Sequence, residues 1–371
     1  MKIIIALNTA WNLVNFRAGL IRALAAKGYE VVAVAPYDEY APRLAALGCR
    51  FVALPMDNKG THPGRDLLLL WRFYWLLRRE RPAVYLGYTV KPNVYGSLAA
   101  HALGISVVNN IAGLGAVFIN DSWLTRLVRG LYRLALLRSV RVFFQNEDDR
   151  RLFVGGGLVR QAVTDQVPGS GVDLERFEVT AFPVSRNKIR FLLIARMLWD
   201  KGVGEYVEAA RIVKRHSPNV EFCLLGFLDV QNPAAISREQ MQTWVEEGVV
   251  NFHGATDDVR PHIAEADCVV LPSYREGTPR TLLEAAAMGR PTITSDAVGC
   301  REVVDDGVNG LLCRPHDAAD LAEKMKRMIA LSPEARAEMG RRGREKVERQ
   351  FDEKIVIRKY LETIAEIVGR S

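Results

Sequence analysis

The sequence contains no long hydrophobic run. Its longest apolar stretch, Leu67–Leu77, is interrupted by Arg72, whereas a membrane-spanning helix needs about 20 apolar residues. The apolar segment Ile3–Leu7 is also shorter than the ~7–15 residues of a signal-peptide core. These absences argue against a membrane span and a secretory leader, and they favour a cytoplasmic protein that is soluble or bound to a membrane surface.

Metal-binding and disulfide patterns are missing as well. The 5 cysteines include no Cys-x-x-Cys pair and the 6 histidines are scattered, so neither a zinc ribbon nor a metal site is predicted. Cysteines in apolar runs, such as Cys268, behave as small hydrophobic residues. A reducing compartment is therefore expected.

Acidic residues are in short supply only in the first half of the chain. Residues 1–180 contain 22 Lys and Arg against 14 Asp and Glu, a net charge of +8. Residues 181–371 contain 28 against 29, a net of −1, and the two halves add to the +7 of the whole chain. A basic first half indicates an anionic surface or ligand as its partner.

What the sequence does contain is a repeated alternation of short apolar strands with amphipathic helices, which is typical of parallel sheets covered on both faces. The pattern stops at Pro168–Gly171 and then restarts. We therefore predict an α/β protein with two Rossmann-like domains whose parallel sheets face each other across a crevice. The predicted parts are residues 1–168, residues 169–350, and a C-terminal helix, residues 351–371, that packs back toward the first domain.

The most informative stretch is Tyr274–Ala285, which follows a buried strand and begins a helix. Gly277 and Pro279 shape the turn, and Thr281 is predicted to cap the helix. Free N–H groups at such a helix start, together with the helix dipole, form a site for an anion.

Charged residues surround this turn and a second one. Glu276 precedes the first turn and Glu284 lies one turn into its helix, where a carboxylate can accept from a ribose hydroxyl. In Leu193–Gly202, Arg196 and Lys201 bracket another strand-to-helix turn, and two such cations suit a diphosphate. The alternative is a pair of ordinary turns with solvated charges.

With these residues the sequence resembles the family 4 glycosyltransferases, which are retaining enzymes of the GT-B fold. The match is to their Glu-x7-Glu element, Glu276 to Glu284 with Glu-Gly-x-Pro inside it, and to their diphosphate-binding pair, Arg196 and Lys201. The resemblance covers essentially the whole chain and is more specific in the second half. It implies a hexosyltransferase whose first domain faces acceptor and membrane and whose second domain binds the nucleotide sugar.

The resemblance also implies a role for each site residue. Glu276 faces the donor sugar and acts in catalysis with Arg196 and Lys201. Glu284 holds the ribose, and the backbone near Gly254 meets the base. The other implied contacts to the nucleotide sugar are Gly277, Thr278, Pro279, Arg280, Thr281 and Leu282.

The implied mechanism is a front-face transfer in which the leaving diphosphate helps to deprotonate the acceptor hydroxyl. Retaining glycosidases use two carboxylates, and the first domain offers no convincing second one. Since GT-B enzymes generally need no metal for the diphosphate, no cofactor is expected.

The first half resembles a bacterial branch of this family that builds surface polysaccharides and N-glycan precursors. Asn-Phe-Arg at residues 15–17 and Gly-Leu-Gly at residues 113–115 carry this resemblance. Branch members transfer hexosamines to undecaprenyl-diphosphate-linked sugars, and one type adds N-acetylgalactosamine to diacetylbacillosamine. Asn15, Arg17, Gly113 and Gly115 are therefore candidate acceptor or donor contacts. The alternative is that Asn15 caps a helix and Arg17 is solvated.

A basic helix supports a lipid-linked acceptor independently. The segment Trp123–Arg141 contains five arginines and no acid, and Arg126, Arg129 and Arg133 fall on one narrow helical face. We expect this face to contact an anionic membrane, which places the protein on the inner face of the cytoplasmic membrane. The segment Asp66–Arg81 also mixes aromatic residues with arginines, but most of its aromatics are predicted to lie in the core.

Alternatives remain open at this point. The same motifs fit another nucleotide sugar and a soluble acceptor. A UDP-sugar 2-epimerase shares the GT-B fold, although the paired motifs argue against it. A nucleic-acid binder is suggested by charge alone, and because no standard nucleic-acid module is present, no nucleic-acid partner is predicted.

Overall fold

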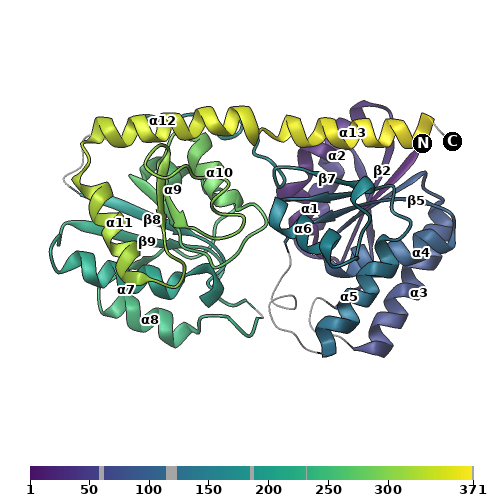
Figure 1. Cartoon of the computed structure of the whole chain (residues 1–371), viewed down its shortest axis with the longest axis horizontal. Coiled ribbons are helices and arrows are strands. Elements are labelled where there is room, and N and C mark those ends of the chain that lie inside the picture. The colour runs from purple at the N-terminus through teal and green to yellow at the C-terminus, as the bar shows by residue number, and fades with distance from the viewer. Residues whose placement is uncertain (58–61, 114–122, 184–187, 231, 370–371) are drawn as a thin grey trace. The chain divides into compact units, whose positions relative to one another are not determined.

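The computed structural model describes residues 1–57, 62–113, 123–183, 188–230 and 232–369, with only the backbone at residues 123 and 124. The chain divides into two compact units (Figure 1). Unit 1 is Met1–Ser170 together with Glu353–Ser371, and unit 2 is Gly171–Asp352. All five cysteines are buried and free, including Cys268, whose apolar surroundings predicted its burial.

Unit 1 is built on a seven-stranded parallel sheet in the order β3-β2-β1-β4-β5-β6-β7. The order reverses between β1 and β4, and ligands of such sheets bind at the carboxyl ends of the strands at this point. Ile3, Ile4 and Ile5 of β1 are all fully buried because helices cover both faces. The strands are β1 Lys2–Ala6, β2 Glu30–Ala35, β3 Cys49–Ala53, β4 Val84–Tyr88, β5 Ser106–Ile111, β6 Arg141–Phe144 and β7 Thr164–Gln166.

Two layers of helices cover the sheet of unit 1. One layer packs against Ile3 and Ile5 and consists of α1 Ala10–Phe16, α2 Ala18–Ala26 and α13 Glu353–Gly369. The other consists of α3 Pro63–Glu80, α4 Ser97–Ala102, α5 Trp123–Leu136 and α6 Glu147–Gly155. Short helical turns lie at η1 Ala41–Leu47, η2 Pro92–Gly96 and η4 Gln161–Val163.

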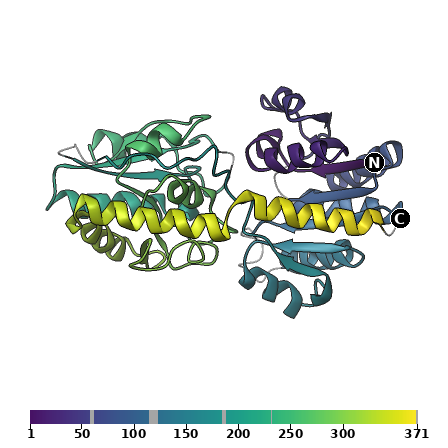
Figure 2. The ribbon, with the colours of Figure 1, turned by 90° about the horizontal axis from the view of Figure 1, so that it is seen from above.

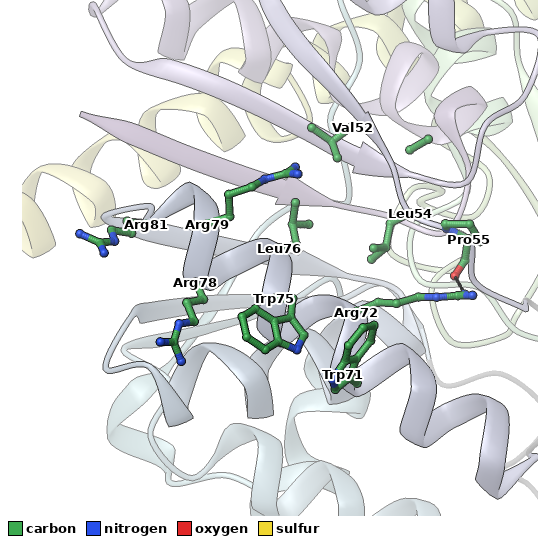
Figure 3. Close-up of a pocket in the computed structure, with 11 residues that line it drawn as sticks. Val52, Leu54, Pro55, Trp71, Arg72, Trp75, Leu76, Arg78, Arg79 and Arg81 are labelled. Atoms are coloured by element: carbon green, nitrogen blue, oxygen red, sulfur yellow. Dashed lines mark hydrogen bonds between the residues drawn. The ribbon is translucent and has the colours of Figure 1, made fainter.

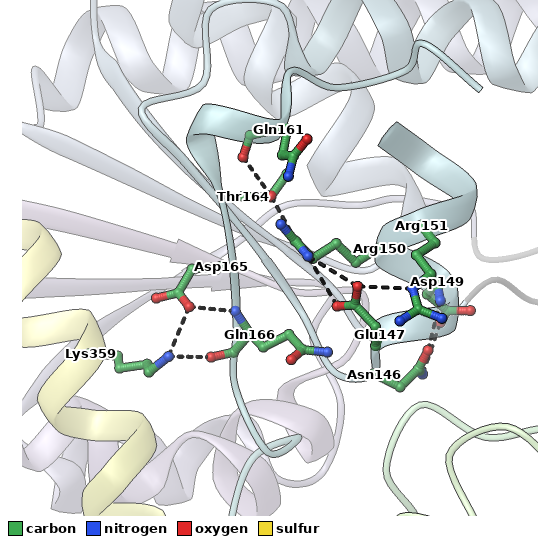
Figure 4. A network of polar contacts seen from close by, with 10 residues as sticks. All are labelled: Asn146, Glu147, Asp149, Arg150, Arg151, Gln161, Thr164, Asp165, Gln166 and Lys359. Carbon is green, nitrogen blue, oxygen red and sulfur yellow. Dashed lines mark hydrogen bonds and ion pairs between the residues drawn. The ribbon is translucent and has the colours of Figure 1, made fainter. Parts of the chain in front are cut away.

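The C-terminal helix α13 completes the core of unit 1, and Figure 2 shows it lying along this unit. Tyr360 and Ile364 are fully buried in the layer that holds α1 and α2. On its flank, Lys359 Nζ donates to Asp165 Oδ1 at 2.9 Å and to the carbonyl of Gln166 at 2.7 Å, which ties α13 to β7 (Figure 4).

The basic segment of unit 1 differs from the prediction in two respects. The helix ends at Leu136, and Arg141 begins β6, where its guanidinium lies 3.6 Å from Glu366 of α13. Arg129 is half-buried, because the helix turns it toward Gly156. Of the three arginines predicted to share an outer face, Arg126 and Arg133 are exposed.

The aromatic residues of α3 also depart from the prediction. Phe73 is fully buried and Tyr74 is half-buried, but Trp71 and Trp75 are 57% and 48% exposed. The helical period explains this result, since residues four apart share a face and the inward face is already filled by Phe73 and its leucine neighbours. The expectation that most of these aromatics lie in the core was therefore wrong for both tryptophans.

Unit 2 repeats the same design with a six-stranded parallel sheet in the order β10-β9-β8-β11-β12-β13. Its order reverses between β8 and β11. The strands are β8 Ile189–Ile194, β9 Val220–Leu225, β10 Asn251–Phe252, β11 Cys268–Leu271, β12 Thr292–Ser295 and β13 Gly310–Cys313. One face carries α7 Val203–Lys214, α8 Arg238–Glu246 and α11 Ala318–Ala330; the other carries α9 Arg260–Glu265, α10 Arg280–Ala287 and α12 Pro333–Gln350.

The described residues contain neither a membrane-spanning helix nor a cluster of metal ligands. None of their helices is both long and apolar enough to cross a membrane. No group of three or more His, Cys, Asp or Glu side chains among them is arranged to hold a metal ion.

Candidate functional site

The candidate site of unit 2 lies at the switch point of its sheet, where β8 and β11 end. Arg196 and Lys201 follow β8, the latter in the short turn η5 Trp199–Lys201, and Glu276 follows β11. Because β8 and β11 are parallel neighbours, both loops leave the same edge of the sheet. The predicted catalytic residues therefore come from adjacent loops at the place where open α/β sheets bind ligands.

Close backbone contact holds these two loops together. Ser273 Oγ and Tyr274 N both donate to the carbonyl of Asp200, at 3.1 and 3.0 Å. Gly202 has a φ of 72°, and a Cβ at this position would lie 2.1 Å from the carbonyl oxygen of Pro272. Glycine is therefore required for the loops to approach so closely.

We predict that Gly202→Ala destabilises the protein and weakens donor binding together. The added methyl group must displace backbone rather than a side chain, and the left-handed φ adds strain of about 1–3 kcal/mol. Urea unfolding and UDP titration measure the two effects. Gly248→Ala is the matched control, since Gly248 has a φ of 69° but nothing within 4 Å of a built Cβ. Equal losses of stability in both variants would contradict the importance of the contact with Pro272.

Lys201 and Glu276 form an ion pair that the sequence did not predict. Lys201 Nζ lies 2.6 Å from Glu276 Oε1, and the two side chains are only 15% and 16% exposed. Charge-assisted bonds of this kind are strong when partly shielded from water. A diphosphate bound by Lys201 must therefore share this ammonium group with Glu276.

Arg196, the other predicted diphosphate-binding cation, does not take part in this ion pair. Its side chain is exposed just after β8, and within the described part of the chain it makes no hydrogen bond or ion pair. Arginine offers a planar fork of donors that matches phosphate oxygens. The site therefore combines one engaged cation with one whose donors are all open to a ligand.

The loop after β12 contacts the backbone of Glu276. Glu276 N donates to the carbonyl of Val298 at 2.9 Å. Gly299 has a φ of 84°, and a Cβ there would lie 2.3 Å from the carbonyl oxygen of Glu276. Burial raises the pKa of the neighbouring Cys300 to about 12, so this thiol stays neutral. Sequence analysis missed Gly299, although a glycine just beyond a short strand was an available signal.

The start of α10 differs from its predicted form. Thr281 does not cap the helix: its Oγ1 donates to the carbonyl of Ile194 at 3.0 Å, because the helix start packs on the end of β8. The N-cap position is Pro279, which supplies no side-chain cap. Neither Pro279 nor Thr281 therefore caps the start of α10 with its side chain. The remaining predicted residues lie in this turn: Gly277 and Leu282 are buried, and Thr278 and Arg280 are half-buried.

Glu284 is paired within its own helix. Arg280 Nε donates to Glu284 Oε1 at 2.8 Å, and the two side chains are 15% and 13% exposed. Burial raises the pKa of Glu284, and Arg280 offsets part of that rise. The folded state therefore favours the protonated acid, so a stability cost of ionisation appears as pH rises through this raised pKa.

We predict that Glu284→Gln raises the donor KM without lowering the stability of the ligand-free protein. A neutral amide removes the cost of a buried charge and keeps an acceptor for Arg280, while a charged acceptor for a ribose hydroxyl is lost. Donor kinetics and unfolding at neutral pH are the measurements. A fall in the unfolding free energy with an unchanged KM would contradict the ribose role.

Gly254, the predicted contact to the base, is hydrogen-bonded to a second glycine at the same sheet edge. It follows β10 with a φ of 71°, and its carbonyl accepts from Gly226 N at 2.7 Å. A Cβ on Gly226 would lie 1.8 Å from the carbonyl oxygen of Ala195. The ends of β10, β9 and β8 are thus drawn together, which places Gly254 at the strand edge that carries Arg196.

Unit 1 has a corresponding edge at its own switch point. The guanidinium of Arg17 lies 4.2 Å above the ring of Tyr88, the last residue of β4. Arg17 is 5% exposed, and its buried Nε has no hydrogen-bond partner among the described residues. Asn110 Nδ2 donates to the hydroxyl of Tyr360 at 3.0 Å. Burial raises the pKa of Tyr360, and the nearby charge of Arg17 offsets part of that rise.

These positions overturn two of the alternative interpretations. Arg17 is buried and not solvated, because it fills the junction between α1 and α2. Asn15 does not cap a helix, since it lies inside α1 and donates to the carbonyl of Trp11 at 3.0 Å, while Thr9 supplies the cap. Gly113 has a φ of 113° after β5, and Gly115 lies outside the described residues.

Comparison with known families decides what this arrangement belongs to. A glycosyl transferase 4-like domain matches residues 15–199, and a glycosyl transferases group 1 domain matches residues 188–330. The chain belongs to this glycosyltransferase family. The assignment agrees with the predicted hexosyltransferase and argues against the isomerase and nucleic-acid alternatives.

Individual relatives extend the match along the whole glycosyltransferase. This chain is 29% identical over 377 aligned residues to an N,N'-diacetylbacillosaminyl-diphospho-undecaprenol alpha-1,3-N-acetylgalactosaminyltransferase of Campylobacter jejuni, and the alignment covers 95% of this chain and 96% of that protein. It is 22% identical to the capsular polysaccharide biosynthesis glycosyltransferase CapM of Staphylococcus aureus, covering 78% of each.

Solved structures confirm the predicted GT-B fold. Sucrose-phosphate synthase from Thermosynechococcus elongatus superposes with a TM-score of 0.82 at 20% identity, covering all of both chains. The Anabaena protein HepE, solved in complex with UDP-glucose, superposes with a TM-score of 0.81 at 18% identity, again over both whole chains. At these identities the likeness establishes the fold of the glycosyltransferase.

Proposed function

We propose that this glycosyltransferase transfers a hexosamine, N-acetylgalactosamine or N-acetylglucosamine, from its UDP-sugar to a saccharide linked to undecaprenyl diphosphate, with retention of configuration. The observation that carries the proposal is the similarity along 95% of the chain to the Campylobacter jejuni enzyme, whose name states such a donor sugar and such an acceptor. The product would enter the assembly of a bacterial surface or protein-linked glycan.

The chemistry fits the charges at the unit 2 switch point. Arg196, Lys201 and the start of α10 would hold the UDP diphosphate, while Glu276 would face the sugar, Glu284 the ribose and Gly254 the base. The bond from the sugar C1 to the diphosphate breaks, the acceptor oxygen bonds to C1 on the same face, and the acceptor proton passes to the leaving diphosphate. Because these protein groups supply the positive charge, the proposal includes no metal or other cofactor.

The acceptor and the membrane are assigned to unit 1. The guanidinium of Arg17, whose buried Nε has no hydrogen-bond partner among the described residues, is suited to an acceptor phosphate; Asn15 in α1 and Gly113 after β5 are further candidate contacts. The outer face of α5 exposes Arg126, Arg133 and two leucines, and Arg138 is exposed just after the helix ends. Such a face suits peripheral attachment to the anionic inner leaflet of the cytoplasmic membrane.

The deciding experiment pairs a donor screen with a transfer assay. Thermal shifts with UDP-N-acetylgalactosamine, UDP-N-acetylglucosamine, UDP-glucose and GDP-mannose identify the donor, because a bound ligand stabilises by mass action. Transfer to a polyprenyl-diphosphate-linked sugar, with and without a chelator, followed by NMR of the new linkage, tests acceptor, metal and stereochemistry. Stabilisation by GDP-mannose alone, an inverted product or exclusive use of a soluble acceptor would overturn the proposal.

Membrane attachment through α5 has its own test. An Arg126/Arg133/Arg138→Glu variant changes only exposed arginines and leaves the half-buried Arg129 in place. Co-sedimentation with anionic vesicles at low and high salt should show strong binding by the wild type, weaker binding by the variant, and a loss of binding as salt rises. Binding by the variant that equals the wild type would remove α5 from the proposal.

A further inference from the structure

Helix α3 presents a second apolar and cationic surface, separate from α5. Trp71 and Trp75 stand on its outer side with ring centroids 6.2 Å apart, and the guanidinium of Arg78 lies 5.3 Å from the centroid of the Trp75 ring. Leu67 and Leu68, one turn before Trp71, are 67% and 43% exposed. We call Leu67, Leu68, Trp71, Trp75 and Arg78 the α3 face.

The acidic residues of α3 do not reach this face. Asp66 is buried and bonded to Lys91 Nζ at 2.8 Å. Glu80 is buried as well, and it pairs with Lys2 at 2.9 Å and with Arg50. Both negative charges are thus neutralised inside unit 1, so the charges that α3 exposes are arginines.

A groove runs beside the α3 face, between α3 and β3. This open groove has a volume of about 620 Å³, and its apolar lining consists of Val52, Leu54, Trp71, Trp75 and Leu76 (Figure 3). β3 is the edge strand of its sheet, so only one side of it is paired, and α3 forms the opposite wall. The volume lies within the ~300–1,000 Å³ range of sites that take a small ligand or a single chain of one.

Four arginines surround this apolar lining. Arg72 donates to the carbonyl of Pro55 at 2.8 Å, which positions one guanidinium where the chain leaves β3. Arg78, Arg79 and Arg81 lie at the other end of α3, and each is exposed (Figure 3). Hydrocarbon walls with cations at both ends match a molecule that has an apolar chain and an anionic headgroup.

We propose that the α3 face docks on an anionic phospholipid bilayer, with Trp71 and Trp75 at headgroup level, one acyl chain in the groove and its phosphate on Arg78 and Arg79. Tryptophan and arginine both favour the boundary between headgroups and chains. The position also fits, because α4 packs against both α3 and α5 and the three helices form one layer of unit 1. The inference rests on the proposed membrane location and adds an inserted anchor and a lipid groove to it.

The test uses the full chain with vesicles of phosphatidylcholine alone or mixed with phosphatidylglycerol. Trp71→Ser/Trp75→Ser should bind mixed vesicles at least about tenfold more weakly than wild type, because it removes the inserted anchor. Arg78→Gln/Arg79→Gln should lose the preference for anionic vesicles and show a shallower salt dependence. Vesicles with brominated acyl chains should quench wild-type tryptophan fluorescence and quench the Trp71→Phe/Trp75→Phe variant much less.

Matched controls come from exposed residues of unit 2. Val245→Ser/Val308→Ser removes apolar side chains of similar exposure, and Arg341→Gln/Arg342→Gln removes adjacent arginines from α12; both should bind vesicles like wild type. Each variant is also assayed for UDP binding, which a folded protein should retain.

The outcomes separate this inference from the proposed function. Wild-type vesicle binding by the α3 variants, with loss of binding in the Arg126/Arg133/Arg138→Glu variant, would overturn the α3 proposal alone. A change of oligomeric state in Trp71→Ser/Trp75→Ser would overturn it too, since the face would then be a protein interface. Absence of vesicle binding by wild type would overturn both membrane proposals, while the donor screen would still judge the transfer reaction.

Discussion

Lys201→Ala is expected to abolish measurable sugar transfer and to weaken UDP binding more than Arg196→Ala does. Loss of one charge-assisted contact costs about 1.5–3 kcal/mol, or roughly 10–150-fold in affinity, and this should be the whole effect for the unpaired Arg196. Removing Lys201 also leaves Glu276 uncompensated next to the diphosphate, because the two side chains are paired at 2.6 Å. Repulsion is therefore added to the lost contact.

Calorimetric UDP titration and single-turnover transfer measure these losses. The double variant Lys201→Ala/Glu276→Gln is the sharpest control, since it removes the cation without leaving a carboxylate behind. It should bind UDP more tightly than Lys201→Ala, and the difference gives the coupling between the two residues. Equal affinity of Lys201→Ala and wild type would place the diphosphate elsewhere.

Glu276→Gln is expected to lower kcat by roughly 10²–10³-fold while leaving UDP binding unchanged or tighter. The substitution keeps the size of the side chain and leaves the backbone bond from Glu276 N to the carbonyl of Val298 intact, so the loop remains in place. It removes the negative charge that we propose faces the sugar as positive charge develops there, which would be a contribution made mainly in the transition state. The same change releases Lys201 for the diphosphate, which explains the unusual combination of slower turnover with undiminished affinity.

Full progress curves at several donor concentrations separate kcat from KM for this variant. Glu208→Gln is the matched control, because Glu208 lies on α7 in a surface pair with Arg211 and should change neither constant. A rise in KM with a normal kcat would reverse the roles assigned to Glu276 and Glu284.

Local sequence patterns were sufficient to predict the fold and to place Arg196, Lys201 and Glu276 in turns that follow buried strands. Parallel strands buried on both faces read as apolar runs, and the two turns stand out because they combine glycine, proline and charge in a short span.

Features that depend on distant parts of the chain could not be predicted. The pairing of Lys201 with Glu276 joins residues 75 positions apart, and it follows from the contact of Gly202 with Pro272 and not from either local sequence. Thr281 has an ordinary capping residue type, but the end of β8 competes for its hydroxyl. The exposure of Trp71 and Trp75 follows from the packing of Phe73 and the leucines of α3, which occupy the core side of the helix.

The discontinuous make-up of unit 1 has a consequence for its synthesis on the ribosome. Domains generally fold as they are made, with the N-terminal one first. Here Tyr360 and Ile364 of α13, which complete the core beside α1 and α2, are translated only after all of unit 2. Until α13 is made, the first 170 residues therefore expose the apolar face that it later covers, and unit 2 can finish folding before unit 1. Truncations or fusions within residues 353–369 should accordingly act on the half of the protein that is made first.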